Sequence, residues 1–211
     1  MYKRQGATHT YSNDGVYNAV CYVTDKLGNT SYKEFKVYVN TEEEDGLIAH
    51  WTFDKIDGNK VVDVSGNGHD GTISGSPSFV EGVTGKAVQF TGDGQLITAA
   101  ADTSFAFGKA SSYTLAAWVK RTKDNGGWQA IFQTGRRSNS NYYGLWIAND
   151  DRFDFGGKGS QSQNIYSGSD YLKDKWYHIT LVQDGEKGTR VLYVNGKNVG
   201  TGSSDSGLSG E

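Results

Sequence analysis

Short alternating segments that end on Asn, Asp or Gly recur along this chain, and they constrain its fold more than any other feature. Segments 176–185 and 191–196 both alternate side-chain character before ending on Asp-Gly or Asn-Gly. A positive backbone φ costs Gly little, and among the other residues it costs Asn and Asp least, so such pairs end strands in tight turns. The repetition predicts stacked antiparallel strands, and therefore an all-β chain.

Composition narrows the classes of partner. The chain has 211 residues, of which 36% are hydrophobic, and its 13 Tyr, 9 Phe and 5 Trp supply large side chains for a core. A net charge of -3 without a basic run argues against binding to nucleic acid or anionic lipid. No apolar stretch approaches the ~20 residues needed for membrane insertion. Cys21 is the only cysteine, so no internal disulfide is expected.

The first unit is expected at residues 1–40, with strands at 17–24 and 32–39 around a turn at 25–29. Its pattern of Tyr, Gly and alternating Val residues resembles the C-terminal half of a PKD or bacterial immunoglobulin-like domain. The earlier strands of such a domain are absent, so we expect a truncation upstream. Residues 41–46 are acidic and predict a solvated linker, which leaves 47–211 as a second unit.

The second unit is predicted to contain many short strands and no long helix. The Asn195-Gly196 pair predicts a two-residue hairpin turn, and Asp102 predicts the cap of a single helical turn ending near Phe107. The expected strands are 47–53, 60–64, 86–91, 95–99, 112–121, 128–134, 143–148, 151–156, 163–167, 175–184 and 189–195. This number of strands is too large for a simple immunoglobulin sandwich.

Several motifs in this unit occur together in one known family. In order they are LIAHWTFD at 47–54, DVSGNGHDG at 63–71, GKAVQF at 85–90, YTLAAWV at 113–119, WYH at 176–178 and LYVNGK at 192–197. They resemble the laminin-G-like domain of the concanavalin A-like lectin/glucanase superfamily. The resemblance implies an antiparallel jelly-roll β-sandwich from an exported protein that binds glycans or other surface molecules. The final strand typical of the family does not follow residue 202, so we expect a C-terminal truncation as well.

Catalysis is the least favoured function. A retaining glycosidase needs two carboxyl groups about 5 Å apart, and no Glu/Asp pair has the spacing that such sandwiches use within one strand. Asp151 and Asp154 are three residues apart, which places them on opposite faces of a strand. His178 alternates with Trp176 and Thr180, and we interpret it as a hydrogen-bonded core histidine. No catalytic residue is assigned.

A calcium ion is one of two interpretations of the turn that begins at Asp63. Asp63, Ser65 and Asn67 alternate, as oxygen ligands do in a calcium loop. The carboxylate expected at the twelfth position is missing, because Ser74 stands there. A hydrogen-bonded turn without an ion explains the same pattern and is favoured. If calcium binds, the resemblance to laminin-G-like domains adds Asp93 as a fourth ligand.

Sugar recognition needs aromatic rings for stacking and polar side chains for hydroxyl groups. Residues 128–154 have this composition, around a long polar loop. The candidate ligand-binding residues are Trp128, Arg136, Arg137, Asn141, Tyr142 and Asp151. The alternatives are that Trp146 and Tyr143 face the core and that Arg136 and Arg137 are only solvated. Trp51, Trp118 and Trp176 are expected in the core.

These observations favour a non-catalytic module of an exported bacterial protein, located outside the cell or on its surface, whose partner is a glycan or glycoconjugate. A protein-binding adhesion or spacer module without a sugar site is the alternative. An accessory fragment of a glycoside hydrolase or protease ranks third.

Overall fold

The computed structural model divides the chain into two compact units, Met1–Leu47 and Ile48–Glu211, which we describe separately. The structure describes residues 10–13, 15–24, 27–39, 46–92, 94–108, 110–123, 126–135, 143–157, 164–168 and 171–203. No helix in these ranges is long and apolar enough to span a membrane.

The first unit is a β-hairpin. Strands β1 (Gly15–Thr24) and β2 (Thr30–Val39) pair in continuous antiparallel register along their whole length. The two strands expected here are confirmed, each beginning two residues earlier than expected. Its assignment to a PKD or immunoglobulin-like domain stays a prediction.

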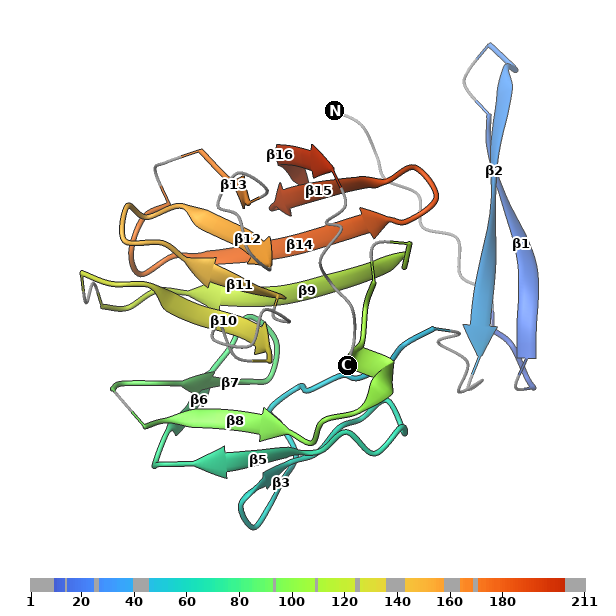
Figure 1. The fold of residues 1–211 in the computed structure, drawn as a ribbon. Coiled ribbons are helices and arrows are strands. Elements are labelled where there is room, and N and C mark those ends of the chain that lie inside the picture. The colour runs from blue at the N-terminus through green and yellow to red at the C-terminus, as the bar shows by residue number, and fades with distance from the viewer. Residues whose placement is uncertain are drawn as a thin grey trace. The chain divides into compact units, whose positions relative to one another are not determined.

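The second unit is built from short antiparallel strands and one 3-10 turn, which confirms the all-β jelly-roll class (Figure 1). The turn, η1 (Thr103–Phe105), is capped by the Asp102 carboxylate, which accepts a hydrogen bond from Ser104 N at 2.7 Å. The first strands are β3 (Ile56–Asp57), β4 (Lys60–Val61), β5 (Gly71–Ser74), β6 (Ser78–Glu81), β7 (Lys86–Gln89) and β8 (Leu96–Ala99). The later strands are β9 (Tyr113–Lys120), β10 (Gln129–Thr134), β11 (Tyr143–Ile147), β12 (Phe153–Gly157), β13 (Ile165–Tyr166), β14 (Trp176–Asp184), β15 (Thr189–Val194) and β16 (Lys197–Ser203).

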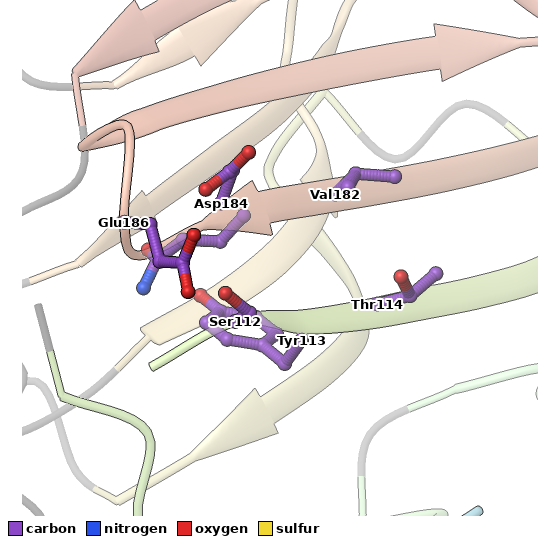
Figure 2. Close-up of a pocket in the computed structure, with 7 residues that line it drawn as sticks. Ser112, Tyr113, Thr114, Val182, Asp184 and Glu186 are labelled. Carbon is purple, nitrogen blue, oxygen red and sulfur yellow. The ribbon is translucent and has the colours of Figure 1, made fainter. Parts of the chain in front are cut away.

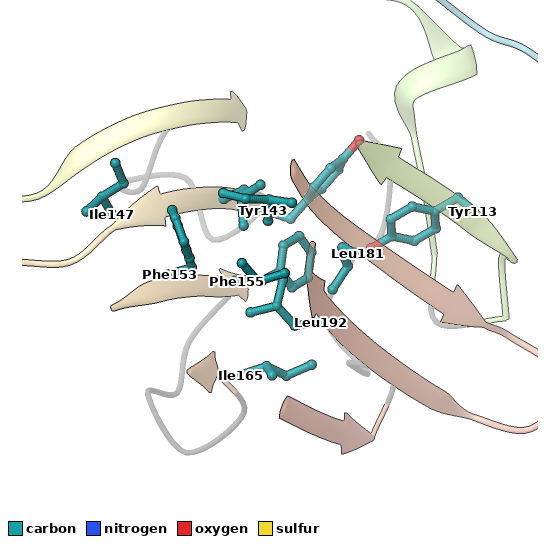
Figure 3. Packing of buried hydrophobic residues seen from close by; sticks show 11 residues of the cluster. Tyr113, Tyr143, Ile147, Phe153, Phe155, Ile165, Leu181 and Leu192 are labelled. Carbon is teal, nitrogen blue, oxygen red and sulfur yellow. The ribbon is translucent and has the colours of Figure 1, made fainter. Parts of the chain in front are cut away.

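The core lies between two four-stranded sheets (Figure 3). One sheet has the order β10-β11-β12-β13 and the other the order β16-β15-β14-β9, while β3-β4-β5-β8 and β6-β7 pair separately. Alternate side chains of each strand face this core. Its buried members are Tyr113, Tyr143, Leu145, Ile147, Phe153, Phe155, Ile165, Ile179, Leu181, Leu192 and Val194. Each of the two sheets therefore has an inner face and an outer face.

The strand expected at 47–53 is wrong, because the structure assigns no strand there. Side chains from the 63–67 turn bind this segment in place of a neighbouring strand. Ser65 Oγ and Asn67 Nδ2 donate to Ile48 O, and His50 N donates to the Asp63 carboxylate. Val64 N also donates to His50 O at 2.9 Å, so side chains and one irregular backbone contact replace ladder pairing at Ile48 and His50.

The expectation that Trp118, Trp176 and His178 are core residues is also wrong. On β14 the inward positions are Tyr177, Ile179, Leu181 and Gln183. Trp176 and His178 therefore lie on the outer face, with Trp118 of β9 opposite His178. Trp118 is 51% exposed. The alternation identified the residues that share a face, but it did not identify which face is buried.

Candidate functional site

Two paired glycines lie on the outer face of the β10–β13 sheet. Gly144 of β11 lies opposite Gly156 of β12. A Cβ atom at Gly144 would overlap the Trp146 ring, and one at Gly156 would overlap the Asn164 amide. The two glycines therefore let the Trp146 indole and the Asn164 side chain lie directly over the sheet.

Asp154 lies beside these glycines and is a buried ionisable group. Its neighbours in sequence, Phe153 and Phe155, face the core, so the Asp154 side chain projects from the outer face. It pairs across the ladder with Trp146 on one side and Tyr166 on the other. Only 1% of the residue is exposed. A charged side chain is rarely buried to this extent without a partner.

The Asp154 carboxyl group is incompletely hydrogen-bonded. Asn164 Nδ2 donates to Oδ2 at 3.2 Å, whereas Oδ1 is buried and has no hydrogen-bond partner in the described structure. Burial raises the pKa of Asp154 to about 7, although the Arg152 charge and the Asn164 hydrogen bond act to lower it. A buried acceptor without a donor costs about 1–3 kcal/mol. A buried polar group left without a partner therefore needs an explanation, and a ligand is one.

Arg152 connects this face to the turn between β11 and β12. Its guanidinium carbon lies 4.5 Å from the centroid of the Tyr166 ring, and its Nε donates to Asp150 Oδ2 at 2.8 Å. The hydrogen bond from Arg152 lowers the pKa of Asp150, so that carboxylate is ionised and engaged by the arginine. Ring, guanidinium and amide groups thus surround the Asp154 carboxyl.

The structure brings two predicted ligand-binding residues to one end of this sheet. Trp128 directly precedes β10 and is 48% exposed, and Asp151 lies in the β11–β12 turn at the same end, with φ of 68°. Asp151 forms an ion pair with Arg121, whose hydrogen bond lowers the pKa of the Asp151 carboxyl. The other four candidates, Arg136, Arg137, Asn141 and Tyr142, lie outside the described residues.

Sequence reasoning missed the central residues of the face. Tyr143 is buried in the core, and its hydroxyl donates to Phe105 O at 2.8 Å. Trp146 is only partly buried and lies on the opposite, outer side of the sheet. The signal that could have identified the face was Asp154 standing between two phenylalanines, with Gly156 on the same strand and Gly144 on the strand before it.

At the proposed calcium turn, the Asp63 carboxylate is bound by protein donors. Oδ1 accepts from His50 N at 2.8 Å and Ser65 N at 3.0 Å, and Oδ2 accepts from Ser65 Oγ at 2.8 Å and His69 N at 3.0 Å. Burial alone would raise the pKa of Asp63, but these hydrogen bonds together lower it. A cation would have to displace these donors, so the geometry fits the hydrogen-bonded turn. Asp93 lies outside the described residues, and calcium binding stays a prediction.

The outer face of the other main sheet carries two shallow depressions. One, of about 440 Å³, lies where β9 begins and β14 ends, and Asp184 and Glu186 are among its lining residues (Figure 2). The other, of about 510 Å³, is lined by Trp118, Trp176, His178 and Asn195. This second depression is the aromatic one.

Sequence comparison places the chain among known proteins. The sequence profile of the concanavalin A-like lectin/glucanases superfamily matches residues 90–210. The chain belongs to this superfamily. The matched range includes both main sheets of the superfamily fold and both outer faces described above. No curated protein matches the chain.

Two solved structures share this fold. Domain 4 of AbnA, a GH43 extracellular arabinanase from Geobacillus stearothermophilus, in complex with arabinotriose, has a TM-score of 0.53 and 21% identity over 76% of this chain and 77% of that one. The binding domain of Paraclostridial Mosquitocidal Protein 1 has a TM-score of 0.56 and 19% identity over 71% of this chain and 39% of that one. A domain from an S-layer domain-containing protein of Clostridium thermocellum is 27% identical over 76% of this chain and 73% of that one, with a TM-score of 0.48.

Proposed function

We propose that this chain is a non-catalytic glycan-binding module that recognises sugar through the outer face of the β10–β13 sheet. The observation that carries the proposal is the buried Asp154 carboxyl, whose Oδ1 has no donor among the residues that the structure describes and which lies beside the partly exposed Trp146 ring. A sugar ring presents apolar C–H groups to an aromatic face and hydroxyl donors at its edge. Trp146 would stack on the ring while a hydroxyl group donates to Asp154 Oδ1.

The residues around Asp154 fit this role. Asn164 offers an amide that already bonds both Asp154 and the Tyr166 hydroxyl. Arg152 is partly exposed and is held by the exposed Asp150, so its guanidinium can shift to admit a hydroxyl group. Trp128 and Asp151, at the end of the same sheet, would extend the site toward further sugar residues.

An enzymatic role receives less support. The raised pKa of Asp154 is a property of general acids, but glycoside hydrolysis requires a second carboxyl group at a defined distance. The neighbouring Asp150 and Asp151 are bound to Arg152 and Arg121.

The arabinanase that contains the similar domain is an extracellular enzyme, which supports an exported parent protein for this module.

The test is binding of the full chain to a panel of neutral oligosaccharides that includes arabinotriose, measured by calorimetry. We expect at least one to bind, with the affinity reduced at least tenfold by Trp146→Ala and by Asp154→Asn. Phe90→Ala removes an aromatic side chain that is 45% exposed outside both sheets, and it should leave binding unchanged. A folded protein that binds none of the panel would favour the adhesion or spacer alternative. Equal binding by wild type and both site variants would place the site elsewhere.

A further inference from the structure

The aromatic depression on the opposite side of the sandwich is a second place where the chain leaves large rings in water. Trp118 is 51% exposed, and its ring centroid lies 5.0 Å from that of His178. Trp176 follows on the same face, two residues before His178. A contiguous exposed apolar patch on a protein surface often marks an interaction site.

Hydrogen bonds hold the His178 side of this depression in place before any ligand binds. His178 N donates to Asn195 Oδ1 at 2.9 Å, and Asn195 N donates back to His178 O at 2.8 Å. Thr180 Oγ1 lies 3.3 Å from His178 Nδ1 and fixes the ring. Because these protein groups are ordered before binding, the protein loses less conformational entropy when a ligand binds.

Several exposed lysines stand near this end of the sheet. Lys120 Nζ lies 4.9 Å from the centroid of the Trp176 ring. β9 ends, β14 begins and β16 begins at this end, and exposed lysines stand there at positions 173, 175 and 197. Asp174 lies among them, and Asp151 is paired with Arg121, the residue after Lys120. At the far end of β14 the charge is different, because Asp184 and Glu186 line the depression of Figure 2 and Lys187 pairs with Asp184.

We propose that this aromatic and lysine-bearing end of the β9–β14 face binds an anionic polysaccharide, whose sugar rings stack on Trp118 and whose carboxylate groups are held by Lys120 and its neighbours. Exposed rings can stack on sugar rings, and the lysines at one end of the depression can pair with the carboxylates of an acidic sugar chain. The site is separate from the Asp154 face, because the core lies between the two sheets.

The experiment compares the full chain on polygalacturonate and on the same polymer with its carboxylates methyl-esterified, by affinity electrophoresis. We expect the acidic polymer to bind, and Trp118→Ala to weaken binding about tenfold through the lost stacking. Lys120→Gln should weaken binding to the acidic polymer, and esterification should weaken binding of the wild type. Phe90→Ala is the matched control and should bind normally.

Failure of this proposal is distinct from failure of the Asp154 site. Asp154→Asn and Trp146→Ala should retain polygalacturonate binding, while Trp118→Ala should retain binding to neutral oligosaccharide. Absent polygalacturonate binding, equal binding by Trp118→Ala and wild type, or equal binding of the esterified polymer would each overturn the proposal. Circular dichroism of each variant confirms that lost binding does not reflect unfolding.

Discussion

Replacing Asp154 by Asn should make the protein less sensitive to rising pH. The folded state holds the pKa of this carboxyl at about 7, against an ordinary value of 3.8. Between these values the folded state binds more protons than the unfolded state, so the free energy of unfolding falls as pH rises and stays lower above about pH 7. With about 1.4 kcal/mol per pKa unit, the loss is on the order of 4 kcal/mol. The amide of Asn has no charge to desolvate and should escape this loss.

The assay is urea unfolding of wild type and Asp154→Asn at about pH 4 and about pH 8, bracketing the transition. The difference in unfolding free energy, variant minus wild type, should rise by about 4 kcal/mol from the lower to the higher pH. Other titrating groups, including Asp63, contribute equally to both proteins and cancel. A difference that does not change with pH would refute the reasoning, because Asp154 would then ionise normally in the folded protein.

Further predictions concern the glycines, the two turns and the buried tyrosine. Gly144→Ala should displace the Trp146 ring, because the added Cβ would overlap it. Thermal melts should show a loss of about 1–3 kcal/mol, and calorimetry should show weaker oligosaccharide binding. Unchanged values would contradict the close packing of the Trp146 ring on Gly144. If the Asp63 turn holds no ion, a chelator should leave the melting temperature unchanged, whereas a clear drop would support calcium. Asp63→Asn should destabilise the protein above the ordinary pKa of Asp, and the difference should shrink as pH falls through the lowered pKa of the folded state. Asn195→Gly keeps the positive φ of 50° but loses the Oδ1 acceptor for His178 N, so it should cost about 1 kcal/mol in urea unfolding. Asn195→Val also has to adopt that φ and should cost at least about 1 kcal/mol more. Tyr143→Phe removes the hydrogen bond to Phe105 O and should cost about 1 kcal/mol; no measurable loss would contradict that bond.

Local turn chemistry made much of the fold predictable from the sequence. The hairpin at Asn195-Gly196 forms between β15 and β16, with φ of 50° and 76°. The cap at Asp102 and most strands from 86 onward also lie where they were expected. These features depend on residues close in sequence, whose conformational preferences are strong.

The choice of buried face was not predictable in the same way, because it depends on which sheet covers which. Trp118 and Trp176 are apolar enough for a core, but the opposite faces of β9 and β14 are the ones that pack on Tyr143 and Phe155. The same limitation hid Arg190, which is fully buried and donates from Nε to Gln183 Oε1 at 2.7 Å. A polar side chain can be buried between the sheets when another strand supplies its hydrogen-bond partner.

The candidate site was predictable only as a region. Residues 128–154 were selected for their composition, and the Asp154 face belongs to that stretch and to β13. Its geometry comes from the cross-strand pairing of Gly144 with Gly156 and of Trp146 with Asp154, which no single segment encodes. Trp128 and Asp151 are on the same sheet, but at its end.

The most direct test of the Asp154 site is a carbon-13 NMR titration of its carboxyl carbon, with and without a saturating oligosaccharide. If a sugar hydroxyl donates to Oδ1, the bound ligand stabilises the ionised form. The pKa should then fall from about 7 toward its ordinary value when the sugar is bound. A pKa that stays the same in the saturated complex would contradict the account.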